Sequence, residues 1–201
     1  MTKMAPFCTI TQAISDFSNG KLLLLLDDDT SSTGHLVFAA QHITPDIINF
    51  MTREAGGILY LALASSIMKK LNLPSLPTNR TDQQYTKASF DYKNSMYDGM
   101  SAAGRVATIR AAIAENARPD DFLTPGNIFP ICAANGGVLR RVGTAEGGID
   151  LASFAGLIPA AVFCSVLNAD GDVAHHEYLI DFAKKNNIHI ATFSDLIRYH
   201  I

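Results

Sequence analysis

The stretch RPDDFLTPGNIFPICAANGGVLRRVGTAEGGIDLASFAGL, residues 118–157, holds the most recognisable motifs of the chain. PGN occupies positions 125–127, FPICA 129–133, GGVL 136–139 and RVGTAEGGIDL 141–151. Apolar residues at helical spacing predict a helix over 149–156, which begins within the end of the last motif. The order and spacing of these four motifs decide which fold the sequence predicts.

The motifs resemble those of the 3,4-dihydroxy-2-butanone 4-phosphate synthase family, in which PGH, FPLRA, GGVL and RxGHTEAxxDL occur in the same order. That family converts ribulose 5-phosphate to a four-carbon ketose phosphate and formate. The resemblance continues at 20–28, where GK precedes a leucine run and DD, at 101–105 (SAAGR against SAADR) and at 164–171. Since it covers nearly the whole chain, it implies one α/β (α+β) domain over 1–201 with a single mixed sheet, forming a homodimer.

Helical and strand signals alternate along the chain without an obvious linker. The predicted helices are 9–19, ended by Gly20, then 46–54, 65–71, 101–116, 149–156 and 177–186, with a last helix starting at Asp195 and capped by Ser194. The predicted strands are 21–26, 58–64, 87–92, 160–167 and 189–192.

Composition is that of a compact protein with one substantial core, since 48% of the 201 residues are hydrophobic and 17% are charged. A net charge of −3 provides no basic surface for nucleic acid. The sequence shows no signal peptide and no apolar run long enough for a membrane span, so we expect no membrane partner. Cys8, Cys132 and Cys164 lack paired metal-type spacing and predict a reducing compartment, hence a cytoplasmic location.

The positions that bind metal in the family carry different residues here. The resemblance implies a metal-binding glutamate near 31–33 and a metal-binding histidine in GHT, where this chain has Ser31, Thr33 and Thr144. Magnesium prefers oxygen ligands that include carboxylates, and neutral hydroxyls do not supply that charge. We therefore expect the family's Mg²⁺ site to be lost and no other cofactor to be bound. The acidic run 27–29 could form a displaced metal site, although such runs are usually solvated.

Three residues are the candidates for catalysis. His35 stands where the resemblance implies a substrate-binding aspartate, and an imidazole that titrates near neutral pH can serve as general acid or base. Ser165 replaces the family's catalytic glutamate, and Glu146 keeps the glutamate of HTEA. The alternatives are a solvated loop histidine for His35 and a favourable helix-dipole contact for Glu146.

Further residues are candidates for contact with a small-molecule substrate. Asp98 falls where the family has the second threonine of TTG, and its carboxylate would repel a phosphate. Arg141 could hold an anion or pair with Glu146, and Cys132 could be a nucleophile only if a nearby cation lowered its pKa. The predicted substrate-binding residues are Ser31, Thr33, Tyr85, Lys87, Asp98, Asn127, Arg141 and Thr144.

Together these substitutions predict a diverged enzyme of the lyase or isomerase type. We expect it to act without Mg²⁺ on a small polar or keto-containing substrate other than ribulose 5-phosphate. One alternative is a noncatalytic paralogue that binds a small molecule or a protein partner. The other is an authentic synthase of riboflavin biosynthesis.

Overall fold

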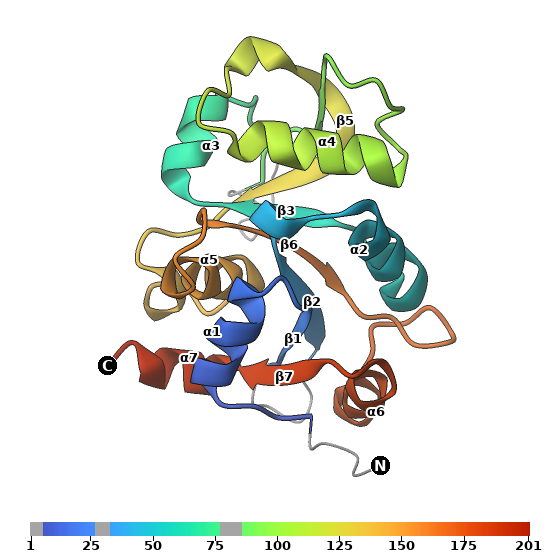
Figure 1. The fold of residues 1–201 in the computed structure, drawn as a ribbon, viewed down its shortest axis with the longest axis vertical. Coiled ribbons are helices and arrows are strands. Elements are labelled where there is room, and N and C mark those ends of the chain that lie inside the picture. The colour runs from blue at the N-terminus through green and yellow to red at the C-terminus, as the bar shows by residue number, and fades with distance from the viewer. Residues whose placement is uncertain (1–5, 27–32, 77–85) are drawn as a thin grey trace.

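The computed structural model describes residues 6–26, 33–76 and 86–201, and Figure 1 traces them. Their centre is a seven-stranded mixed sheet in the order β4-β5-β3-β6-β2-β1-β7. The β1–β7 and β3–β5 pairs are parallel, and the other neighbouring pairs are antiparallel. The strands are β1 (Leu23–Leu26), β2 (Gly34–Ala39), β3 (Tyr60–Leu63), β4 (Phe90–Tyr92), β5 (Phe122–Cys132), β6 (Ala160–Ser165) and β7 (His189–Thr192). The predicted mixed α/β fold is confirmed.

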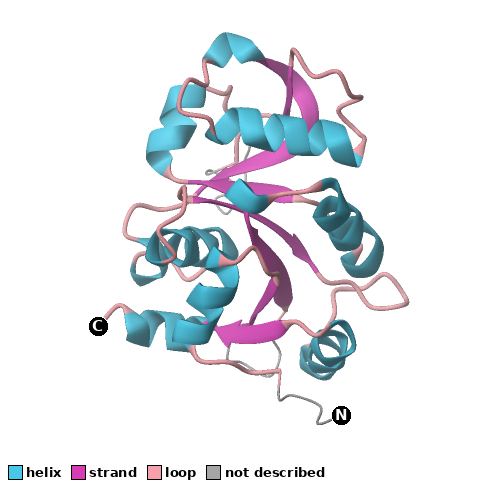
Figure 2. Cartoon of the chain, viewed as in Figure 1, coloured by secondary structure: helices cyan, strands magenta, loops and turns pink. Residues whose placement is uncertain are grey.

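Helices cover both faces of this sheet, as Figure 2 shows. The α-helices are α1 (Ile10–Ser18), α2 (Pro45–Phe50), α3 (Ser65–Leu71), α4 (Ala102–Ile113), α5 (Thr144–Phe154), α6 (His176–Asn186) and α7 (Phe193–Tyr199). Single turns of 3₁₀-helix occur at Ala40–His42, Pro119–Asp121 and Gly137–Leu139, and a π-helical turn follows α2 at Met51–Ala55. No helix in the described ranges is long and apolar enough to cross a membrane.

Two apolar cores result, one on each face of the sheet. Residues of α1, α5 and α7 form one core, and residues of α2, α3, α4 and α6 form the other. The leucine run of β1 contributes to both, because Leu23 and Leu25 point into the first core while Leu24 and Leu26 point into the second. A continuous apolar run is what a strand covered on both faces requires.

Threonine hydroxyls cap the starts of α1 and α2. The hydroxyls of Thr9 and Thr44 accept hydrogen bonds from the backbone N–H groups three residues on, at 3.2 Å and 3.3 Å. The predicted cap of α7 is wrong. Thr192, not Ser194, accepts the bond from the Asp195 N–H at 3.1 Å, and the helix begins at Phe193.

The segment before α1 pairs with the outer edge of β7. The N–H of Cys8 donates to the carbonyl of Ile190 at 3.0 Å, and the N–H of Ile190 donates to the carbonyl of Pro6 at 2.6 Å. A parallel bridge joins Phe7 to Ile190. The outer backbone groups of Ile190 are therefore already hydrogen-bonded.

The structure adds strand residues that the sequence patterns did not predict. β5 runs over 11 residues that contain Pro125 and Pro130. β2 includes His35, which the sequence placed on a loop. The helix predicted at 149–156 begins earlier, at Thr144, so that Glu146 lies in the first turn of α5.

Candidate functional site

His35 and Ser165 lie directly opposite each other on the antiparallel strands β2 and β6. Directly opposed side chains share one face of the sheet, with Cβ atoms about 5 Å apart. The His35 ring packs edge-on against Phe163, with ring centroids 6.1 Å apart, and Phe163 stacks on Tyr60 at 5.3 Å. Two of the predicted catalytic residues are thus brought together beside an aromatic row.

Burial among these groups changes the acid–base character of His35. It lowers the pKa of the imidazole from 6.5 to about 4. The ring is therefore neutral at pH 7 and a weak base, in contrast to the titration near neutrality that the isolated side chain would show. A neutral imidazole can still hydrogen-bond and polarise a carbonyl group.

The lowered pKa of His35 predicts a pH dependence of stability. Between the unfolded pKa of 6.5 and the folded pKa of about 4, the unfolded chain takes up a proton that the folded chain does not. Stability should therefore fall as the pH drops through this window, and His35→Asn should make that fall smaller. Urea unfolding at several pH values and an NMR titration of the His35 ring measure both effects. A ring midpoint above pH 6 would contradict the prediction.

Glu146 and Arg141 form a buried ion pair at the start of α5. Only 1% of the Glu146 side chain is exposed, against 29% for Arg141. Arg141 donates to Glu146 Oε1 from Nε at 2.9 Å and also from Nη2, and the Ala134 N–H donates to the same oxygen at 2.7 Å. Arg141 Nη2 also reaches the Cys132 carbonyl at 3.3 Å. Glu146 therefore ties α5 to the end of β5, as the pairing alternative predicts.

Lys87 and Arg141 both lie near Cys132 at the end of β5. The Lys87 N–H donates to the Pro130 carbonyl at 3.3 Å, and its ammonium donates to Ser75 Oγ at 2.7 Å. Burial raises the pKa of the Cys132 thiol, and the opposing effect of the nearby cations Lys87, Arg141 and Lys69 does not overcome it. The thiol thus stays protonated at neutral pH, which argues against a nucleophilic role.

Asn127 lies at the β4–β5 end of the sheet, where Gly99, the residue after Asp98, packs against it. Asn127 donates to both carboxylate oxygens of Asp91, from the backbone N–H at 3.0 Å and from Nδ2 at 2.7 Å. Gly99 packs against this pair so closely that an added Cβ would lie 2.3 Å from Asp91 Oδ2. Asp98 is exposed and accepts a hydrogen bond from the Met100 N–H at 2.8 Å. Asp91, which sequence reasoning missed, is the residue that orients Asn127.

The remaining predicted residues are only partly described. Thr33 is exposed just before β2, and Thr144 is half-buried at the first position of α5. Ser31, Tyr85 and the acidic run 27–29 lie outside the described residues.

The described side chains include few groups of the kind that bind magnesium near the candidate site. Within the described ranges, no group of three or more His, Cys, Asp or Glu residues is placed to hold a metal ion. Thr144 offers a hydroxyl, and Oε1 of Glu146 already accepts the bonds from Arg141 and Ala134. Magnesium favours carboxylate oxygens, and the acidic run 27–29, the other place where the sequence offers them, lies outside the described residues.

Comparison with known proteins shows which family shares this fold and these motifs. The family model described as 3,4-dihydroxy-2-butanone 4-phosphate synthase matches residues 11–199. The chain is 40% identical over 200 residues to the riboflavin biosynthesis protein RibBA of Aquifex aeolicus, a match that covers 97% of this chain and 49% of that protein. It is 38% identical over 199 residues to the 3,4-dihydroxy-2-butanone 4-phosphate synthase of Sodalis glossinidius, covering 97% and 91%.

Solved structures agree with this result. The two-domain synthase RibBX from A. baumannii superposes with a TM-score of 0.89 at 40% identity, covering 96% of this chain and 58% of that one. The Candida albicans synthase gives a TM-score of 0.90 at 30% identity, covering 97% and 98%.

A mixed sheet covered by helices on both faces, with the GGVL turn leading into α5, defines a synthase-type α/β protein. The chain belongs to the 3,4-dihydroxy-2-butanone 4-phosphate synthase family. It spans about half the length of several curated relatives, 49% of the Aquifex aeolicus protein and 55% of the Neisseria meningitidis synthase.

Proposed function

We propose that this chain is a diverged enzyme of the synthase family that acts, without Mg²⁺, on a small polar or keto-containing substrate other than ribulose 5-phosphate. The observation that carries the proposal is the pairing of His35 with Ser165 across β2 and β6. The resemblance implies an aspartate and a glutamate at these two positions. Here both positions are neutral at pH 7, because burial holds the pKa of His35 at about 4.

A neutral pair of this kind favours hydrogen bonding over charge stabilisation. The His35 imidazole and the Ser165 hydroxyl can each donate or accept a hydrogen bond at a substrate carbonyl or hydroxyl. In this proposal His35 polarises the carbonyl or takes up a proton as a weak general base, and Ser165 orients the substrate.

The charged candidates fit a substrate with less negative charge than a phosphosugar. Arg141 shares its guanidinium with the buried carboxylate of Glu146, which offsets part of its attraction for an anion. Asp98 presents an exposed carboxylate where the family resemblance implies a threonine hydroxyl. We propose that Arg141 anchors a substrate oxygen and that Asp98 disfavours a phosphate group.

We also propose that the chain is a homodimer. Large apolar side chains are exposed on β5 and on the loop between β4 and α4, a location that would suit a second copy. These residues are Met96, Tyr97, Met100, Leu123 and Phe129. A monomeric mass by light scattering at micromolar concentration would contradict the dimer.

The decisive experiment is an assay for formate release from ribulose 5-phosphate in the presence of Mg²⁺. The Sodalis glossinidius relative serves as the parallel control. We expect no formate above the buffer background, because the implied metal and acid–base groups are replaced. Turnover at about 1 per second or more, an ordinary enzymatic rate, would overturn the proposal and favour the activity for which the relatives are named.

A second arm separates a changed enzyme from a noncatalytic paralogue. Small hydroxyketones and keto acids are screened for turnover with the unmodified chain and with His35→Ala. In a changed enzyme the variant should lose roughly 100-fold in turnover while keeping its circular dichroism spectrum. Binding of these compounds without any turnover would favour the noncatalytic alternative.

A further inference from the structure

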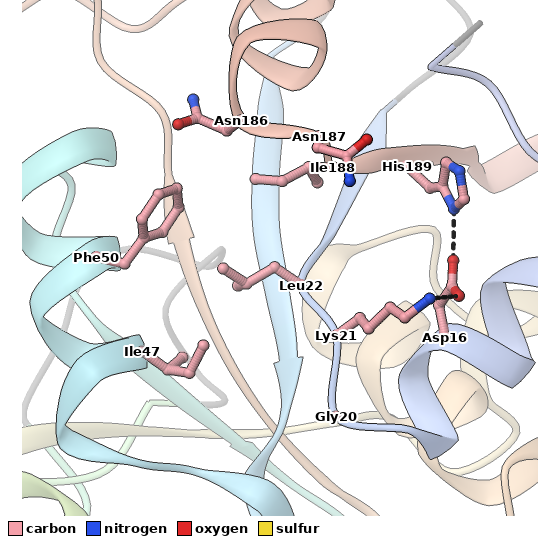
Figure 3. A pocket seen from close by; sticks show the side chains of 10 residues that line it. All are labelled: Asp16, Gly20, Lys21, Leu22, Ile47, Phe50, Asn186, Asn187, Ile188 and His189. Carbon is pink, nitrogen blue, oxygen red and sulfur yellow. Dashed lines mark hydrogen bonds and ion pairs between the residues drawn. The ribbon is translucent and has the colours of Figure 1, made fainter. Parts of the chain in front are cut away.

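A cavity of about 360 Å³ lies where α1, α2 and the turn from α6 to β7 meet the start of β1. Figure 3 shows its lining: Asp16, Lys21 and His189 gather on one side, Ile47 and Phe50 on the opposite side. The cavity is separate from the candidate catalytic residues. It adjoins the amino ends of β1 and β7, whereas His35 pairs with Leu25 near the carboxyl end of β1.

The polar side of the cavity is organised around one buried carboxylate. Asp16 is 2% exposed and accepts hydrogen bonds from Lys21 Nζ at 2.9 Å, from Gln12 Nε2 at 3.0 Å and from the His189 ring. Burial acts to raise the pKa of Asp16, but the hydrogen bonds from Lys21, His189 and Gln12 outweigh it and hold the pKa below its usual 3.8. The carboxylate is therefore charged at neutral pH.

Backbone groups add to the negative electrostatic potential that Asp16 creates in the cavity. α1 ends at Ser18 and α6 ends at Asn186, so the carboxyl ends of two helices adjoin the cavity. A helix carries partial negative charge at its carboxyl end. A buried carboxylate together with two such helix ends favours a cation and disfavours an anion.

The cation that occupies this position in the structure is the ammonium of Lys21. Its side chain remains 62% exposed although the ammonium contacts Asp16. A long, exposed lysine side chain loses little when it moves into water. A ligand can therefore displace the Lys21 ammonium from Asp16.

The other side of the cavity is apolar. Ile47 and Phe50 form a wall on α2, and Leu22 and Ile188 lie between that wall and Asp16 (Figure 3). These side chains would cover the hydrocarbon body of a ligand and remove it from water. The cavity therefore combines an anionic end with an apolar end.

We propose that this cavity binds a small organic amine, whose ammonium replaces that of Lys21 on Asp16 and whose apolar body packs against Ile47 and Phe50. The site is independent of the proposed catalytic function, since it shares no residue with it. A free primary amine on a short aliphatic or aromatic body has the required shape and charge.

The test compares 2-phenylethylamine with its neutral counterpart 2-phenylethanol. Binding to the 201-residue chain is followed by the NMR shifts of the methyl groups of Leu22, Ile47 and Ile188. The amine should give saturable shifts at these methyls at millimolar concentration, and the alcohol should bind at least about tenfold more weakly because it lacks the charge-assisted bond. Equal binding of the two compounds, or amine shifts confined to other methyls, would overturn the proposal.

Two variants, with a third as control, test whether the Asp16 carboxylate binds the amine and whether the Lys21 ammonium competes with it. Lys21→Met removes the competing ammonium and should tighten amine binding by about tenfold, whereas Lys93→Met, at an exposed lysine elsewhere, should leave it unchanged. Asp16→Asn should abolish the preference for the amine over the alcohol. If Asp16→Asn does not fold, the comparison of Lys21→Met with Lys93→Met decides, and equal amine affinities in these two variants would overturn the proposal.

Discussion

Replacing Glu146 by alanine is expected to lower the free energy of unfolding by about 3 kcal/mol, because it removes the buried carboxylate that a cation and a backbone N–H share. Glu146 is 1% exposed and accepts bonds from Arg141 Nε at 2.9 Å and from the Ala134 N–H at 2.7 Å. The loss should stay near the lower end of the range for broken buried pairs, since Arg141 is 29% exposed and can be partly solvated. Urea unfolding measures it.

Glu177 provides the matched control for this variant. It also lies in the first turn of a helix, α6, but is exposed. Glu177→Ala should cost less than about 1 kcal/mol, the usual size of a helix-dipole contact. Equal losses in the two variants would mean that Glu146 acts only on the helix dipole.

Gly137→Ala is expected to destabilise the fold by about 3 kcal/mol, through backbone strain and the loss of a buried hydrogen-bonded group. Gly137 has a φ of +59°, and an added Cβ would lie 2.0 Å from Asp150 Oδ1. Asp150 is 7% exposed and accepts bonds from the Val138 N–H at 2.8 Å and from the His200 ring at 2.9 Å. The methyl group would displace this carboxylate from both partners. Thermal and urea unfolding measure the effect.

The variant Gly156→Ala separates the effect of backbone strain from the effect of contact with Asp150. Gly156 has a similar φ of +68°, but an added Cβ would meet nothing within 4 Å. Gly156→Ala should therefore show the strain alone, about 1 kcal/mol. A loss as large as that of Gly137→Ala would show that contact with Asp150 has no part in the effect.

Elements with local signals could be predicted from the sequence. The helix 65–71 and the strand 189–192 match α3 and β7. β5 could not be predicted in this way. Pro125 and Pro130 argue against a strand, and only the pairing with β3 and β4 holds this segment extended.

The sequence could predict which residues are candidates for the site, but it could not predict the surroundings of their side chains. The order of the motifs was enough to single out His35. Its low pKa, however, depends on the burial of its side chain beside β6 and Phe163. The pairing of Arg141 with Glu146 was one of two alternatives, which only the geometry distinguishes. Asp91 had no motif of its own, and its role depends on the close approach of β4 to Asn127.

The segment that pairs with β7 has a consequence for how molecules of this protein behave when crowded together. An open sheet edge is a template on which strands of other molecules can assemble into aggregates. Here Pro6 and Cys8 already hydrogen-bond the outer groups of Ile190. At the opposite edge β4 is only three residues long, too short to template an extended intermolecular sheet. Ile190 is therefore unavailable for pairing with a strand of another molecule, and β4 offers only a three-residue edge.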